Sequence, residues 1–167
     1  MAVLPIRRFP DPLLKRPTHP VRRIDAHAAR LINSMIATMH HYPHCVGLAA
    51  PQVGSSLRIA VMDASRSSKA TTHHGLVVLV NPTLELGPEF TVGREGCMSL
   101  PDFTGNAQRS TRALVKALDR SGEACEWIFE GFEAIVAQHE VDHLDGLLFL
   151  DRVANLQTDL FRRKTYR

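Results

Sequence analysis

Residues 131–144 read GFEAIVAQHEVDHL, and their pattern predicts one helix from Gly131 to Leu144. Apolar residues and two histidines recur in it at helical spacing, at Phe132, Ile135, Val136, His139 and His143. Side chains three, four and seven positions apart lie on one face of a helix. Both histidines therefore share the apolar stripe that we expect to face the interior.

The same segment contains the sequence H-E-x-x-H, in which His139 and His143 are separated by four positions and Glu140 follows the first. At this spacing the two imidazoles lie one above the other and can bind one metal ion, with Glu140 beside a bound water. Two core histidines satisfied by hydrogen bonds are the alternative, which the intervening acid and the helical pattern disfavour. Because hydrolytic zinc sites use three protein ligands, a third ligand is needed.

The best candidate for that third ligand lies upstream. After His143 the only acids are Asp145, Asp151 and Asp159, and no histidine follows. Cys97 stands in Arg94-Glu95-Gly96-Cys97-Met98-Ser99-Leu100-Pro101, where the adjoining glycine gives the backbone freedom. A divalent metal would deprotonate the thiol outright.

The rest of the chain predicts an α+β fold, with antiparallel strands packed around this central helix. Prolines make Met1–Val21 an irregular N-terminal arm, and a helix follows from the N-cap Asp25 to about His40–Pro43. Strand patterns occupy five segments, which are Arg58–Met62, Leu76–Asn81, Thr83–Leu86, Ala113–Ala117 and Glu126–Phe129. We expect residues 1–167 to form a single catalytic domain, with a short basic tail at about residues 155–167.

Composition excludes several classes of protein. The 167 residues are 44% hydrophobic and 22% charged, which is typical of globular domains rather than disordered or collagen-like chains. The longest aliphatic run, Leu76–Val80, is far shorter than the roughly 18 residues of a membrane helix, so no membrane partner is expected. Three cysteines do not make a disulfide framework, and the N-terminus resembles no signal peptide. These features favour a cytoplasmic protein, bacterial or a processed organellar form.

Three spaced segments resemble the signature motifs of the peptide deformylase family. They are Gly47-Leu48-Ala49-Ala50-Pro51-Gln52, Glu95-Gly96-Cys97-Met98-Ser99 and Gln138-His139-Glu140-Val141-Asp142-His143. The flanks, around Pro10–Leu13 and Leu144–Phe149, are similar as well. The resemblance implies a metal-dependent hydrolase that removes the N-formyl group from the N-terminal methionine of nascent chains and releases formate.

The resemblance also implies a role for each motif residue. Cys97, His139 and His143 become the ligands of one divalent metal ion per chain, and Glu140 becomes the general acid and base. Gln52 and the backbone N–H of Met98 become the oxyanion donors, since a tetrahedral oxyanion needs fixed hydrogen-bond donors. Family members use Fe²⁺ in the cell and accept Zn²⁺, Ni²⁺ or Co²⁺, and the Cys/His/His set alone suggests Zn²⁺ equally.

N-formylmethionyl nascent peptides are the expected partners. The segment Val46–Leu48 is expected to expose a strand edge to which an extended peptide can add. The candidates for binding the substrate and its methionine side chain are Val46, Gly47, Leu48, Phe132, Ile135 and Val136. Arg109 and Arg112 are candidates for contacting the carboxylate or backbone of the peptide, but ordinary solvated side chains are the favoured expectation for both.

Two departures from the family pattern stand out. Cys45 replaces the glycine with which the first motif normally begins, and the C-terminal segment is short. Arg162, Arg163, Lys164 and Arg167 could still meet ribosomal RNA phosphates, a contact that is blind to sequence, so no sequence-specific nucleic acid is expected. The net charge of +3 is too weak to require it.

Three other functions compete with the deformylase interpretation. An H-E-x-x-H endopeptidase would need an open groove and normally a downstream ligand. A catalytically silent relative would bind peptide or metal without hydrolysis. The departure from the motif at Cys45 is compatible with this alternative. A structural zinc domain would need a fourth ligand, for which Cys45 is the one obvious candidate.

Overall fold

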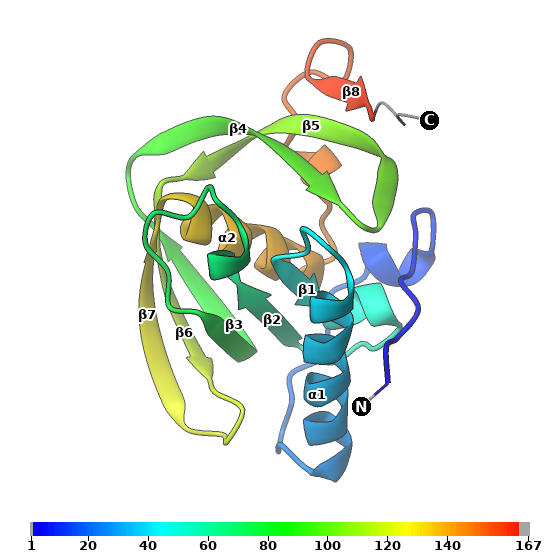
Figure 1. Cartoon of the computed structure of the whole chain (residues 1–167), viewed down its shortest axis with the longest axis vertical. Helices are drawn as coiled ribbons and strands as arrows, with labels where there is room; N and C mark the ends of the chain where they lie inside the picture. Colours follow the sequence, from blue (N-terminus) through cyan, green and yellow to red (C-terminus); the bar gives the residue numbers. More distant parts are fainter. Residues whose placement is uncertain (1, 164–167) are drawn as a thin grey trace.

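The computed structural model describes residues 2–163, which form two antiparallel sheets and two α-helices (Figure 1). Helix α2 (Gly131–Leu144) lies between the sheets, and helix α1 (Ala26–His41) packs to the side. This arrangement confirms the predicted α+β class, with strands around a central helix. Neither helix is long and apolar enough to cross a membrane.

The larger sheet has the strand order β1-β2-β3-β6-β7, with every neighbouring pair antiparallel. Its strands are β1 (Gly47–Ala49), β2 (Ile59–Asp63), β3 (Leu76–Leu86), β6 (Arg112–Leu118) and β7 (Ala124–Glu130). The two strands predicted on either side of Pro82 are one strand, β3. Asn81 has a φ of 55° there, and the pairing with β6 shifts register between Val80 and Thr83.

The smaller sheet has the order β4-β5-β8 and arches over α2 (Figure 1). It consists of β4 (Phe90–Cys97), β5 (Leu100–Ser110) and the short β8 (Leu160–Arg162). None of these strands was predicted. Glycines and charged residues interrupt the alternation of β4 and β5, and β8 lies within the expected basic tail.

The larger sheet is buried on both faces around β2 and β3. Ala60 and Met62 face α2, whereas Ile59 and Val61 face α1, as the two-residue period of a strand requires. Helix α1 begins as predicted: the Asp25 carboxylate accepts hydrogen bonds from the backbone N–H groups of His27 and Ala28, at 2.9 Å each. It ends at His41, two residues before Pro43.

Helix α2 differs from the expected amphipathic helix because it is covered on nearly every side. Glu133, Gln138, Glu140 and Asp142 are all buried. The sheet of β4 and β5 supplies the partners that this burial requires, since Gln138 exchanges two hydrogen bonds with the Ser110 backbone, at 3.0 and 2.8 Å. Apart from Gly131 at its start, only Phe132, Ile135 and His139 of this helix are partly exposed, and they lie along one stripe.

The N-terminal arm is irregular, as expected, apart from the single-turn 3₁₀ segment Pro12–Lys15. Further 3₁₀ segments of the described chain are Ala50–Val53, Ala64–Arg66 and Phe149–Arg152. The backbone N–H of Arg7 donates to the Gln52 carbonyl at 2.7 Å, and that of Phe9 donates to the Ser99 carbonyl at 2.9 Å. The arm thereby ties together the segments that carry the candidate site.

Candidate metal centre

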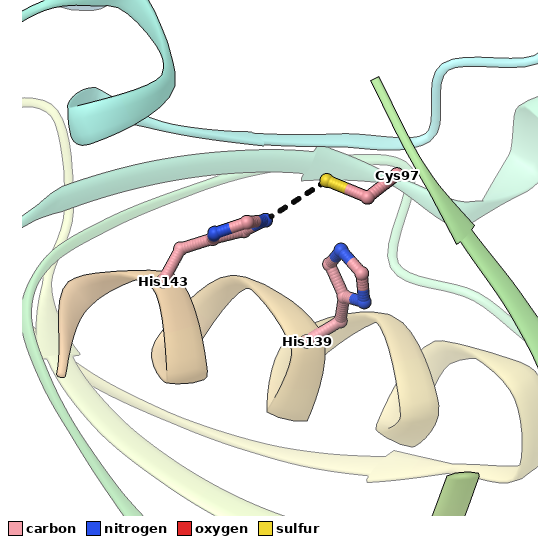
Figure 2. Close-up of side chains that lie close together, drawn as sticks. All are labelled: Cys97, His139 and His143. Atoms are coloured by element: carbon pink, nitrogen blue, oxygen red, sulfur yellow. Dashed lines mark hydrogen bonds between the residues drawn. The ribbon is translucent and has the colours of Figure 1, made fainter. Parts of the chain in front are cut away.

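Cys97, His139 and His143 come together in the interior and offer three ligand atoms that lie within 4.8 Å of one another. The histidines project from successive turns of α2, with ring centroids 4.9 Å apart, and Cys97 reaches them from the end of β4 (Figure 2). The Cys97 sulfur lies 3.3 Å from His143 Nε2. A thiolate and two imidazoles at this spacing suit a divalent ion such as Zn²⁺ or Fe²⁺.

The electrostatics of the three side chains favour a thiolate. Burial opposes ionisation of Cys97. The positive field of His143, together with hydrogen bonds from His139 and His143 to the sulfur, nevertheless holds the pKa of the Cys97 thiol well below its usual range. Burial likewise opposes a charge on His139, but the Cys97 sulfur and the Glu95 carboxylate raise the pKa of that imidazole. An ionised thiol is the form that binds metal.

Glu95 orients His139. Its carboxylate accepts a hydrogen bond at 2.8 Å from His139 Nδ1, so the other ring nitrogen is directed to the ligand cluster. Burial raises the pKa of Glu95, but hydrogen bonds from His139 and Arg109 outweigh that effect and lower it to about 2. Glu95 therefore stays ionised and keeps the imidazole in one orientation.

Arg109 is not solvated, which makes that expectation wrong. It is 3% exposed and donates to Glu95 from Nε at 2.7 Å and to Asp142 from Nη1 at 2.5 Å. Arg152 donates to the same Asp142, at 2.7 and 3.0 Å. Two carboxylates thus hold one buried guanidinium in place behind the ligands. Arg112, in contrast, is exposed as expected.

Glu140 is buried beside the ligands, and its Oε2 atom has no hydrogen-bond partner among the described residues. Burial raises the pKa of this carboxyl to about 7, against the opposing positive field of His139 and His143. Gly47 makes room for it, because a Cβ at that position would lie 2.7 Å from the Glu140 carboxyl carbon. A carboxyl group titrating near neutrality can both accept and donate a proton.

Gln52 points its side-chain amide at the same cluster. Its Nε2 lies 3.4 Å from the Cys97 sulfur and 3.3 Å from Ser99 Oγ, and its Oε1 accepts from the Ala49 N–H at 2.9 Å. The amide is therefore fixed with its donor side toward the ligands. Met98 lies in the turn directly after Cys97 and, like Gln52, lines the adjoining cavity.

A cavity of about 670 Å³ opens in front of the cluster. Of the residues expected to bind substrate, Val46, Gly47, Phe132, Ile135 and Val136 line it. Leu48 does not, since its side chain is fully buried in the core beneath α1. β1 and β4 are the outer strands of their sheets, and both border the cavity, which leaves strand edges to which an extended peptide can add.

Cys45 also lines the cavity but stands outside the ligand cluster of the described residues. Its thiol is directed to the Gly47 carbonyl oxygen at 3.2 Å, and burial, with the nearby Glu140 charge, raises the pKa of the thiol to about 12. The position does not need glycine, since Cys45 is absent from the residues with positive φ. Within residues 2–163 no fourth ligand joins Cys97, His139 and His143. A closed structural zinc site, which needs four protein ligands, therefore does not fit.

Sequence reasoning assigned no role to Glu95, Arg109, Asp142 or Arg152. Glu95 and Asp142 lie inside the motifs, but both pair with Arg109. Arg109 is 14 positions from Glu95 and 33 positions from Asp142 in the sequence. Two of the expected ribosome-contacting residues, Lys164 and Arg167, lie outside the described part of the chain. Arg162 belongs to β8, and Arg163 lines the cavity.

Comparisons with known proteins agree with this geometry. Residues 3–159 match the family model described as polypeptide deformylase. The chain is 40% identical over 164 residues to the peptide deformylase of Thermodesulfovibrio yellowstonii, covering 98% of this chain and 97% of that protein. It is 43% identical over 160 residues to the enzyme of Thermotoga maritima, covering 95% and 92%.

Solved structures are similar over the same extent. The crystal structure of the Thermotoga maritima peptide deformylase matches with a TM-score of 0.84 at 42% identity, covering 93% of this chain and all (100%) of that one. The actinonin-bound class I type b enzyme of Acinetobacter baumannii matches with a TM-score of 0.81 at 36% identity, covering 92% and 100%.

Proposed function

The chain belongs to the polypeptide deformylase family, metal-dependent hydrolases that remove the N-formyl group from nascent polypeptides, and from this premise we propose what each residue of its cavity does. The observation that carries the proposal is the convergence of five side chains at one site, of which all but His143 line the cavity and His143 lies against Cys97. They are Cys97, His139, His143, Glu140 and Gln52.

Cys97, His139 and His143 hold one divalent metal ion per chain. We propose Fe²⁺ in the cell, with Zn²⁺, Ni²⁺ and Co²⁺ as possible replacements, because the same mixture of thiolate and imidazole ligands accepts all four. When bound, such an ion lowers the pKa of water from 15.7 to about 7 and so supplies hydroxide at neutral pH.

Glu140 moves the proton. It accepts a proton from the attacking water as the new C–O bond forms at the formyl carbon, and it delivers that proton to the methionine nitrogen as the C–N bond breaks. The products are formate and a peptide with a free amine. A raised pKa suits both steps, since the carboxyl group must change protonation state twice in one turnover.

Gln52 and Met98 stabilise the tetrahedral intermediate. The Gln52 amide is held by Ala49, so its Nε2–H can donate to the oxyanion without reorganising, and the backbone N–H of Met98 is the second donor. Losing one such donor typically costs on the order of 10²–10³ in rate.

The peptide lies between the free edges of β1 and β4 as an added strand. Val46, Gly47 and Leu48 contribute backbone along one edge, and the methionine side chain enters the apolar part of the cavity. Phe132, Ile135 and Val136 form that part. Residues 1–167 act together as one catalytic domain in the cytoplasm, where formylated nascent chains are made.

Formate release from a formyl-Met peptide is the test, using anaerobically purified protein loaded with Fe²⁺ or Ni²⁺, because an iron–thiolate site is prone to oxidation. Glu140→Gln is expected to keep one metal per chain and to lose activity by on the order of 10²–10⁴. Metal loss from Glu140→Gln would contradict the role given to this residue.

Cysteine variants provide a matched control. Cys97→Ser is expected to lose both the metal and formate release, whereas Cys125→Ser, at a half-buried position in β7, is expected to keep both. Cleavage of unformylated peptides would instead favour the endopeptidase alternative. A metal-loaded parent without any activity would favour the silent relative.

Ribosome contact through the C-terminal basic residues stays a prediction. Deleting Thr158–Arg167 would remove β8, which pairs with Phe103–Gly105 of β5, so charge substitutions are the cleaner test. Unchanged co-sedimentation of Arg162→Gln with ribosomes would count against a contact at that residue.

A further inference from the structure

Three exposed cationic residues border the cavity. Lys69, Arg94 and Arg163 line it from three separate segments, and all three side chains are exposed. The acidic lining residues, Glu95 and Glu140, are buried. The fixed charge that the cavity presents to an approaching peptide is therefore positive.

None of the three cations is neutralised by a carboxylate within residues 2–163. Arg94 donates to the side-chain oxygens of Asn106 and Thr104, at 3.0 and 3.2 Å, and its guanidinium lies 3.4 Å from the centroid of the Phe161 ring. These contacts hold the guanidinium in place without cancelling its charge.

Arg163 lies directly over β4, one residue from the metal ligand Cys97. A Cβ at Gly96 would collide with the Arg163 Nη2 atom, so the absence of a side chain there allows the guanidinium its position. The backbone of the segment is anchored, because Arg163 N–H donates to the Asp102 carbonyl at 2.7 Å and β8 pairs with β5.

Lys69 approaches the cavity from the opposite border. Its ammonium lies 5.6 Å from the centroid of the Phe132 ring, which belongs to the proposed methionine site. The positive charges thus border the cavity both on the β4 side and on the α2 side.

We propose that Lys69, Arg94 and Arg163 make this enzyme prefer nascent peptides with Asp or Glu at the second or third position. An extended peptide advances about 3.3 Å per residue, so the two side chains after the methionine lie within about 10 Å of it, at the cationic mouth. The proposal rests on the proposed function of the cavity. A carboxylate about 6 Å from one cation in water gains about threefold in binding, and several cations together raise this to about tenfold.

Formyl-Met-Xaa-Yaa peptide amides test the proposal, with Glu, Gln or Lys at Xaa or Yaa and the C-terminal amide removing the terminal charge. We expect kcat/KM to fall in the order Glu, Gln, Lys, with a Glu-to-Gln ratio of about tenfold at low salt. Most of the difference should reside in KM, and 0.5 M salt should reduce the ratio to near one.

Charge variants then locate the effect. Arg163→Gln and Lys69→Gln should each shrink the Glu-to-Gln ratio by about threefold, and Arg163→Glu, which changes two charges, should bring this ratio near one. Arg162→Gln is the matched control, because it makes the same charge change one residue away at a side chain that does not line the cavity. It should leave the ratio unchanged.

Equal kcat/KM for Glu and Lys peptides would overturn the proposal, as would a ratio that Arg163→Glu leaves intact. The proposal would also be overturned if Glu and Lys peptides had the same kcat/KM and Arg163→Glu co-sedimented more weakly with ribosomes. The cations would then bind RNA phosphates rather than substrate. Absence of formate release from every peptide would instead contradict the proposed function.

Discussion

Gly47 and Glu140 share one space: the carboxylate of Glu140 occupies the volume in which a side chain at position 47 would begin. The first motif is thus coupled sterically to the third. A glycine is required at position 47 because of this approach and not because of a positive φ.

Gly47→Ala is expected to displace the Glu140 carboxylate while leaving the proposed ligands Cys97, His139 and His143 in place. A displacement of about 1 Å from the reacting geometry can cost about 10²-fold in rate, so we expect that loss in kcat with one metal retained per chain. Formate release and metal analysis check it. Gly93→Ala is the matched control, because a Cβ there meets no atom within 4 Å. Equal losses in both variants would refute the steric coupling.

Arg109→Leu is expected to destabilise the protein by about 3–5 kcal/mol. The substitution leaves the carboxylates of Glu95 and Asp142 buried without their shared cation, and an uncompensated buried charge costs about this much. Denaturant unfolding measures the loss. Arg112→Leu, which disturbs only an exposed ion pair of 3.8 Å with Glu130, should cost less than about 1 kcal/mol. A similar cost for both would mean that the buried network contributes little.

Acid should destabilise the protein through Glu95. Its pKa is about 2 in the folded chain against 4.5 for the ordinary carboxyl group, so between these pH values the unfolded chain binds a proton that the folded chain does not. Stability is therefore complete above pH 4.5 and is lost as the pH falls toward 2, by about 3 kcal/mol. Glu95→Gln, unfolded in EDTA across this range, should lose that part of the pH dependence. Glu126→Gln, on the exposed side of β7, should keep it.

Cys45→Gly, which restores the usual first residue of the motif, is expected to lower stability by about 1–2 kcal/mol. It removes a buried side chain and adds backbone freedom at a position with ordinary dihedral angles. Because the thiol of Cys45 is un-ionised and stands outside the ligand cluster, metal content should not change. Unfolding and metal analysis check both statements, and a Cys45→Gly protein that gains metal affinity would contradict the second.

The sequence predicted the parts of the site that depend on local spacing. His139 and His143 share a helix, so four-residue spacing alone brings their rings together, and Asp25 caps α1 through its immediate neighbours. The α+β class followed from helices and strands with clear periodicity.

Features that depend on distant partners were not predictable in this way. An arginine is normally exposed, and nothing near Arg109 in the sequence indicates that Glu95 and Asp142 enclose it. The strands β4 and β5 contain Gly93, Gly96 and Gly105, and these glycines weaken the strand pattern in the sequence. The strands form nevertheless because they pair with each other over most of their length.

The site draws on both ends of the described chain. The Arg7 N–H donates to the backbone of Gln52, a residue that lines the cavity, while Arg163 lines the cavity beside Gly96, so residues 156 positions apart support one site. A chain growing on a ribosome from its N-terminus cannot assemble this mouth until β8 has emerged from the exit tunnel. The pairing of β8 with β5 and the N-terminal contacts at Gln52 span large distances in the sequence, so we expect the complete site to be among the last parts of the fold to form.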